Sequence, residues 1–219
     1  MSKSFKKIIN QLLELKVFRS NPSLSQIDLE YAGEEVLTQG KPSQQEPCQY
    51  LDEKERQNYL LVGKMDHNND YKLYYKSNGK LADTSNFNGK MGLSYAAYAI
   101  DKFGRMYINE HISSHNKNDK NNFFFHSSFL SGQAGVCFGM CVIKNGKIEF
   151  IDNRSGHYKP TTQHLKNAIE RLMPYFSPSA KVYCQQEAPK EDSSEEIFLG
   201  DFFHEESEDY SISEFLARF

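Results

Sequence analysis

At 219 residues the chain has the length of one domain with appendages rather than of two full domains. Hydrophobic residues make up only 38% of it, but 16 Phe and 13 Tyr can still build a sizeable core. It has no run of about 18 consecutive apolar residues and no apolar block of a classical signal peptide at its start, so we expect a soluble protein without a transmembrane segment.

The net charge of −3 hides two oppositely charged ends. Five basic residues and one Glu give residues 1–20 a net charge of +4, whereas eleven carboxylates and two basic residues give residues 185–219 a net charge of −9. The middle has no Lys/Arg block, so nucleic acid is not an expected partner. The four cysteines include no CxxC pair, which disfavours a disulfide framework and a cysteine-based zinc site.

The first segment predicts an amphipathic helix over residues 4–17, because its apolar residues recur at i, i+3, i+4, i+7 and i+8 from Phe5 to Leu13. We expect this helix to pack on the domain. Basic amphipathic helices also bind membrane surfaces or calmodulin, but the spaced Gln and basic positions of an IQ motif are absent here.

The next segment, residues 20–49, is rich in Ser, Pro, Gly and Gln and predicts an irregular connection with a short strand near Ile27–Tyr31. A short helix is predicted to follow. Asp52 and Glu55 have the spacing of its capping box, which gives Glu55 a structural role in preference to a catalytic one.

Strand periodicity begins at Tyr71, and three hairpins are predicted from turn residues that favour positive φ. Their strands are 71–76 with 80–84 around Asn78-Gly79, 93–101 with 105–110 around Lys102-Phe103-Gly104, and 136–143 with 147–153 around Asn145-Gly146.

A two-residue turn in the third hairpin fixes its expected register. It pairs Ile143 with Ile148, Cys141 with Phe150 and Cys137 with Arg154. Both cysteines would then lie on one face as buried side chains, about 13 Å apart and too distant for a disulfide or a shared metal.

Residues 111–122 are polar and predict a loop, in which His111 and His115 are expected to be solvated. The following run, 123–130, predicts a strand. Strand alternation would put His126 on one face with Ser128, and Ser127 on the other.

The stretch SGHYKP, residues 155–160, leads into a second amphipathic helix whose apolar face runs from Leu165 to Met173 and which ends at Pro174. Residues 180–184 predict an edge strand. The expected fold class is α+β: an antiparallel β-meander of about five to seven strands with one amphipathic helix packed on it, plus the N-terminal helix.

Three parts of the chain are expected: an N-terminal amphipathic helix (1–20), a single α+β domain (21–184) and an acidic tail (185–219). The tail's composition predicts disorder or a segment that docks on a partner, although its last apolar residues, from Ile212 to Phe219, have helical spacing.

Two histidines flank the third hairpin, and its folding back would bring them together. The candidate catalytic residues are a base, a hydroxyl donor and a second proton carrier, namely His126, Ser128, His157 and Tyr158. The candidate ligand-binding residues are Ser127, Gly132, Ser155 and Gly156.

Three functions stay open for this cleft: an enzyme, a binding module, or a structural lock in which the two histidines pin the strand to the helix. A Ser-His hydrolase would also need an orienting carboxylate, for which Asp152 and Glu110 are near in sequence. No metal site is predicted.

The motifs FHSSFLSG, Lys-Asn-Gly-Lys and SGHYKP, in that order, resemble the domain that follows the IQ motif in plant IQM (IQ-motif calmodulin-binding) proteins. Similar domains occur in some bacterial effectors and polymorphic toxins. Upstream pieces at residues 33–36, 49–51 and 55–59 agree, and the resemblance spans about residues 29–173. The family usually has a small-residue run here (FLAGG, then an Ala-rich stretch), where this chain has SGQAG at residues 131–135 and then Cys137-Phe138. Because the IQ motif is missing, calmodulin binding is not implied.

The acidic stretch at residues 204–209 is similar to the glutamate-rich export signals of effectors delivered by the Dot/Icm (type IV) secretion system. An effector context implies secretion into a host cell and a host protein as partner; otherwise the chain would be cytoplasmic. It also raises ADP-ribose transfer from NAD, with NAD or a similar nucleotide as the ligand. Neither Glu149 nor Glu170 is a convincing late catalytic glutamate for that reaction.

Overall fold

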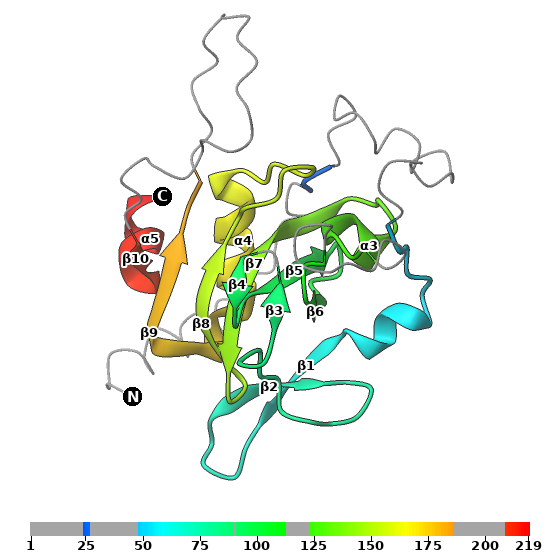
Figure 1. Cartoon of the computed structure of the whole chain (residues 1–219). Helices are drawn as coiled ribbons and strands as arrows, with labels where there is room; N and C mark the ends of the chain where they lie inside the picture. The colour runs from blue at the N-terminus through cyan, green and yellow to red at the C-terminus, as the bar shows by residue number, and fades with distance from the viewer. Residues whose placement is uncertain (1–23, 27–47, 90, 113–122, 186–208) are drawn as a thin grey trace, which may run out of the picture.

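The computed structural model describes residues 24–26, 48–89, 91–112, 123–185 and 209–219 (Figure 1). The predicted helix at 4–17, the strand near Ile27–Tyr31, His115 and all of the export-signal stretch except Asp209 lie outside these residues. A six-stranded sheet organises the described part of the chain. Its spatial order is β10 (Tyr210–Ser211), β9 (Phe176–Tyr183), β8 (Lys147–Asp152), β7 (Gly135–Lys144), β5 (Ala96–Asp101) and β6 (Met106–Asn109).

The predicted α+β class is confirmed, and most strand pairs in the sheet are antiparallel. The pair β8–β9 is parallel, because the helix between them carries the chain back across the sheet. This helix is α4 (Thr162–Leu172), continued by the 3-10 turn η2 (Met173–Tyr175). The predicted edge strand at 180–184 corresponds to β9, which is longer than predicted. It is not an edge strand, because β10 pairs with its outer side.

The β7–β8 hairpin turns at Asn145 and Gly146, whose φ values of 50° and 76° fit the predicted two-residue turn. The expected pair Ile143–Ile148 is confirmed. A register shift after Val142 then pairs Cys141 with Ile151, so the predicted pairing with Phe150 is wrong. A β-bulge adds a residue to one strand, which a register counted from the turn does not include. The predicted Cys137–Arg154 pair is also wrong, because β8 ends at Asp152 and Cys137 pairs with β5.

Residues alternate across β7 between two cores on opposite faces of the sheet. On one face, Cys137 and Cys141 are buried, as predicted, and they pack with the apolar stripe of α4. On the other face, Phe138 and Met140 pack with α3 (His126–Leu130). The sheet therefore packs α4 against one face and the short helix α3 against the β5–β7 end of the other.

The predicted capping box is present. Asp52 Oδ1 accepts a hydrogen bond from the backbone N–H of Glu55 at 2.7 Å, and Glu55 Oε2 accepts one from the N–H of Asp52 at 2.8 Å, before η1 (Glu55–Asn58). Glu55 therefore has the structural role that its spacing predicted. At α4 the N-cap is Thr161, whose Oγ1 accepts a hydrogen bond from the backbone N–H of His164, and Pro160 lies just before it.

Smaller strand pairs flank the sheet. The first contains β1 (Leu61–Met65) and β2 (Tyr71–Tyr75), and the second contains β3 (Asn88–Gly89) and β4 (Gly92–Leu93). The predicted hairpin at Asn78-Gly79 reduces to a single bridge between Tyr74 and Leu81, since β2 pairs along its length with β1.

The last residues of the chain form β10 and α5 (Ile212–Arg218). Ile212 and Phe215 are buried in the core, which confirms the predicted helical spacing and ties this segment to β9. The composition had indicated disorder or a partner-docking segment here, but two apolar anchors outweigh the acidic neighbours for residues 210–218. Within the described part of the chain, the helices are too short or too polar to cross a membrane.

Candidate functional site

The signature stretch around His126 is a short helix, so the predicted strand at 123–130 is wrong. Ser128 explains the difference: its Oγ accepts a hydrogen bond from the backbone N–H of Phe125 at 2.9 Å and caps the first turn. Ser131 ends the helix in the left-handed conformation, with φ 53°. The pairing of His126 with Ser128 on one strand face is therefore also wrong.

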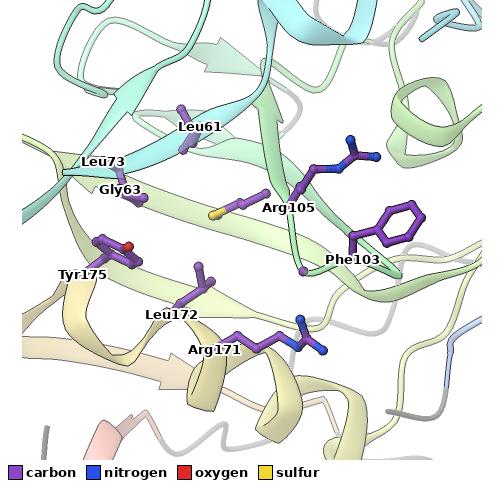
Figure 2. Close-up of a pocket in the computed structure, with 10 residues that line it drawn as sticks. Leu61, Gly63, Leu73, Phe103, Arg105, Arg171, Leu172 and Tyr175 are labelled. Carbon is purple, nitrogen blue, oxygen red and sulfur yellow. The ribbon is translucent and has the colours of Figure 1, made fainter. Parts of the chain in front are cut away.

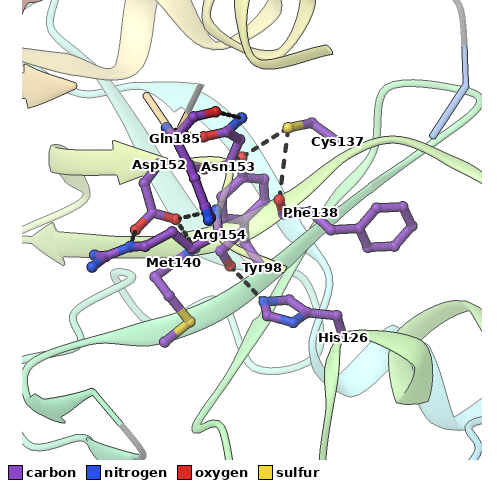
Figure 3. A network of polar contacts seen from close by, with 10 residues as sticks. Tyr98, His126, Cys137, Phe138, Met140, Asp152, Asn153, Arg154 and Gln185 are labelled. Atoms are coloured by element: carbon purple, nitrogen blue, oxygen red, sulfur yellow. Dashed lines mark hydrogen bonds and ion pairs between the residues drawn. The ribbon is translucent and has the colours of Figure 1, made fainter. Parts of the chain in front are cut away.

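His126 points at the neighbouring strand. Its Nε2 lies 2.9 Å from the carbonyl oxygen of Gly139 in β7, and its side chain is only 5% exposed (Figure 3). A carbonyl only accepts hydrogen bonds, so Nε2 must carry the proton. A side chain at position 139 would collide with the carbonyl oxygen of Asp152, which explains the glycine. This hydrogen bond ties α3 to the sheet.

Asp152, the last residue of β8, stabilises the same part of the sheet. Its carboxylate is fully buried and accepts hydrogen bonds from the N–H groups of Met140 and Arg154 at 2.6 and 2.9 Å, and from Arg154 Nε (Figure 3). Burial raises the pKa of Asp152, and Arg154 opposes that rise. Tyr98 donates to the Asp152 carbonyl at 2.7 Å. These contacts give Asp152 a place in the sheet rather than the role of orienting His126.

The other candidate carboxylate, Glu110, accepts a hydrogen bond from the backbone N–H of Asn88 at 2.9 Å. That contact ties β3 to the end of β6. Within the described ranges, no three His, Cys, Asp or Glu side chains gather closely enough to hold a metal ion.

An aromatic cluster does bring the two signature stretches together. The ring of Phe125 lies 6.3 Å from that of His157 and 5.4 Å from that of His111, which in turn lies 5.3 Å from His126. His111 was expected to be solvated, but it is half-buried in this cluster. The bridge between Ile112 and Phe124 places it there, and the sequence gives no local sign of that pairing.

Tyr158 is buried in the same core cluster as Phe129 and Phe138. Its ring stacks on Phe138 with centroids 3.5 Å apart, and its hydroxyl donates to the carbonyl of Gln133 at 3.1 Å. Ser25 Oγ donates to the Tyr158 carbonyl at 2.7 Å. Tyr158 thus fastens residues 155–160 to the sheet.

Some of the predicted ligand-binding residues are buried and others are accessible to solvent. Ser127 is fully buried in α3, and its carbonyl accepts from the N–H of Gly132 at 3.0 Å. Ser155 is buried, and its Oγ has no hydrogen-bond partner within the described residues. Gly156 is exposed, with open space where a side chain would stand. Of the eight candidates, Gly156 is exposed, Gly132 and His157 are half-buried, and the other five are buried.

A pocket of about 460 Å³ lies elsewhere, between β1–β2, the β5–β6 turn and the end of α4 (Figure 2). Sequence reasoning missed it. One signal was present, the apolar Phe103 at the tip of a predicted hairpin. The pocket is lined by Leu61, Gly63, Leu73, Phe103, Gly104, Arg105, Met106, Arg171, Leu172 and Tyr175.

The structure defines a small α+β module in which two signature stretches pack on one sheet. The chain belongs to the family of the IQ motif-containing protein middle domain, whose family model matches residues 55–165. The match runs from η1 into α4 and includes both signature stretches. The resemblance predicted from the motifs is thereby confirmed.

Three relatives from Arabidopsis thaliana are similar to this chain. It is 30% identical to IQ domain-containing protein IQM2 over 129 residues, 59% of this chain and 19% of that protein. It is 29% identical to IQM3 over 124 residues, 55% of this chain and 23% of that protein. It is 45% identical to IQM1 over 53 residues, 24% of this chain and 11% of that protein. The chain thus spans about a fifth of IQM2 and IQM3, and no solved structure matches it.

Proposed function

We propose that this chain is a non-catalytic binding or adaptor module that engages a host protein. The observation that supports the proposal most is the burial of His126, Ser128 and Tyr158, whose polar atoms hydrogen-bond to the protein itself. A general base must reach the proton that it removes, whereas Nε2 of His126 is directed at a carbonyl. The signature serves to hold α3 and residues 155–160 on the sheet.

A second candidate function is catalysis on a nucleotide-type substrate, by NAD hydrolysis or ADP-ribose transfer, through His126, Ser128, His157 and Tyr158. Two observations favour it. Imidazole rings gather around Phe125, and imidazoles exchange protons near neutral pH. Ser155 has a buried hydroxyl with no partner within the described residues, and it stands next to the exposed Gly156.

Incubation with NAD separates the two functions. The binding module releases no nicotinamide above the buffer rate and adds no mass to the proteins of a host lysate. A second nucleotide, ATP, is assayed for phosphate release in the same way. Turnover by the wild-type chain that disappears in a folded His157→Ala variant would overturn the binding proposal, because His157 is the signature histidine that reaches the surface.

Delivery into a host cell is part of the same proposal, supported by the glutamate-rich stretch at residues 204–209. A fusion to a translocation reporter, expressed in a strain with a Dot/Icm system, tests it. Reporter signal inside host cells is expected with the wild-type stretch and is expected to fall when its four glutamates and aspartates at 205, 206, 208 and 209 become alanine. Equal signal from a strain that lacks the secretion system would contradict delivery by this route.

A further inference from the structure

We propose that the pocket between β1–β2, the β5–β6 turn and the end of α4 binds an acidic peptide segment that inserts an apolar side chain. The inference rests on the proposed binding function and specifies the chemistry of the partner. Three features carry it: an apolar floor, a cationic rim and an exposed aromatic side chain at the mouth (Figure 2).

The floor of the pocket is hydrocarbon. Its volume of about 460 Å³ falls in the range of roughly 300–1,000 Å³ that is typical of ligand sites. Tyr175 adds an aromatic wall beside Gly63, where any side chain would collide with the tyrosine ring. The apolar lining consists of Leu61, Leu73, Met106 and Leu172.

The rim carries positive charge. Arg105 is held in place by a 2.6 Å ion pair between its Nε and Asp101 Oδ2, and its guanidinium lies 5.0 Å above the ring of Phe103. Arg171 packs over Gly104, where a side chain would collide with its guanidinium. Lys102 does not line the pocket, but its ammonium lies 5.2 Å from the ring of Phe103 and adds a third cation to this side of the molecule. Facing them are the buried Asp101, which neutralises one cation, and Glu53, whose charge acts on Arg105.

Phe103 stands at the mouth and is 67% exposed. The ammonium of Lys102 lies 5.2 Å from its ring, and Arg105 lies on it as well. A large exposed aromatic flanked by arginines, beside an apolar recess, has the composition of the anchor region of protein interfaces.

The lining favours a peptide over a nucleotide. A nucleobase in this pocket would leave most of its edge donors and acceptors against hydrocarbon, which is costly. An aliphatic or aromatic side chain has no such groups, and flanking glutamates would be attracted by the positive charge of Lys102, Arg105 and Arg171. The recess thus selects the apolar residue, and the rim selects acidic flanks.

Fluorescence anisotropy of a labelled synthetic peptide tests the proposal, with Leu-Phe flanked by two glutamates on each side as the probe and the full chain as the receptor. We expect saturable binding that weakens as salt is raised. Two matched peptides serve as controls, one with lysines in place of the glutamates and one with alanines in place of Leu-Phe. Each is expected to bind at least about tenfold more weakly than the probe.

The matched receptor variants are Phe103→Ala against Leu93→Ala, which removes a 72% exposed side chain that does not line the pocket. For charge they are Lys102→Glu against Lys80→Glu, an exposed lysine away from the pocket lining. Only the first variant of each pair is expected to lower the affinity for the probe peptide, by about tenfold, and its thermal unfolding is expected to stay unchanged.

Equal binding by both members of each pair would overturn the peptide site, and so would failure of the glutamate probe to bind at all. Saturable binding of ADP that competes at this pocket and is lost in Phe103→Ala would replace the peptide with a nucleotide. NAD turnover by the wild-type chain would overturn the proposed non-catalytic function and leave the peptide site intact, so the two failures can be told apart.

Discussion

The imidazole of His126 is joined to the backbone of Gly139: its Nε2 lies 2.9 Å from that carbonyl oxygen, across the contact between α3 and β7. The same glycine has no space for a side chain, because the Asp152 carbonyl lies against it. The histidine at the centre of the signature is therefore a buried structural contact between α3 and the sheet. Two predictions follow from this contact.

Replacing His126 with alanine is expected to destabilise the fold by about 2–4 kcal/mol, since it removes a buried hydrogen bond and leaves a cavity. Urea unfolding followed by circular dichroism measures the free energy. The control is His67→Ala, which alters an exposed turn and is expected to change it by less than about 0.5 kcal/mol. Equal stability of the two variants would show that the contact contributes little.

Gly139→Ala is expected to cost about 2–3 kcal/mol, because the new methyl group meets backbone that can move only by separating β7 from β8. Gly156→Ala is the matched control and is expected to be neutral, since its methyl group would enter open space. Thermal unfolding of both variants, recorded side by side, checks the difference. A neutral Gly139→Ala would contradict the close approach at that position.

The turn between β1 and β2 should respond to acid. Lys72 Nζ lies 2.9 Å from Asp66 Oδ2, and this hydrogen bond, with two backbone N–H donors, lowers the pKa of Asp66 to about 2. The unfolded carboxyl takes up its proton at higher pH, so this contribution to stability is present above about pH 4 and is lost as the pH falls toward 2.

Unfolding midpoints in urea between pH 2 and 6 measure that dependence. The free energy of unfolding is expected to fall less steeply with falling pH in Asp66→Asn than in the wild-type chain. Asp209→Asn, near the end of the chain, serves as a control with an exposed carboxyl. An identical slope in Asp66→Asn and the wild-type chain would contradict the role of the Lys72 pair.

The four thiols are expected to react in two classes. Burial raises the pKa of Cys137 to about 12 and that of Cys141 higher still, so neither supplies thiolate at neutral pH. Cys48 and Cys184 are half-buried. Iodoacetamide labelling followed by mass spectrometry is expected to modify these two in the native chain and all four in denaturant. Rapid native labelling of Cys137 would contradict its placement between sheet and α4.

The elements that the sequence predicted well are those specified by local chemistry. The Asn145-Gly146 turn, the apolar stripe of α4 and the Asp52–Glu55 cap depend on residues within a few positions of one another, and all three are present. The helix at His126 was missed because eight residues of mixed apolar and hydroxyl character fit either period. The hydrogen bond that the backbone N–H of Phe125, the N-cap, donates to Ser128 Oγ decided the outcome.

Long-range contacts account for the rest. The bulge after Val142 shifted the pairing of Cys141, and the packing of His111 on Phe125 comes from a bridge between separate segments. The two signature stretches were correctly expected to meet. Whether their side chains face a ligand or the protein depends on burial, which local sequence does not specify, and here most of them face the protein.

The most direct test of the structural role of the signature compares His126→Gln with His126→Ala. Glutamine keeps an N–H donor within reach of the Gly139 carbonyl but has no imidazole to transfer a proton. The free energy of unfolding of His126→Gln is expected to recover at least half of what alanine loses, with binding of the acidic peptide unchanged. A His126→Gln chain as stable as the wild type that has lost a nucleotide turnover shown by the wild type would contradict the account, because the imidazole itself would then be required.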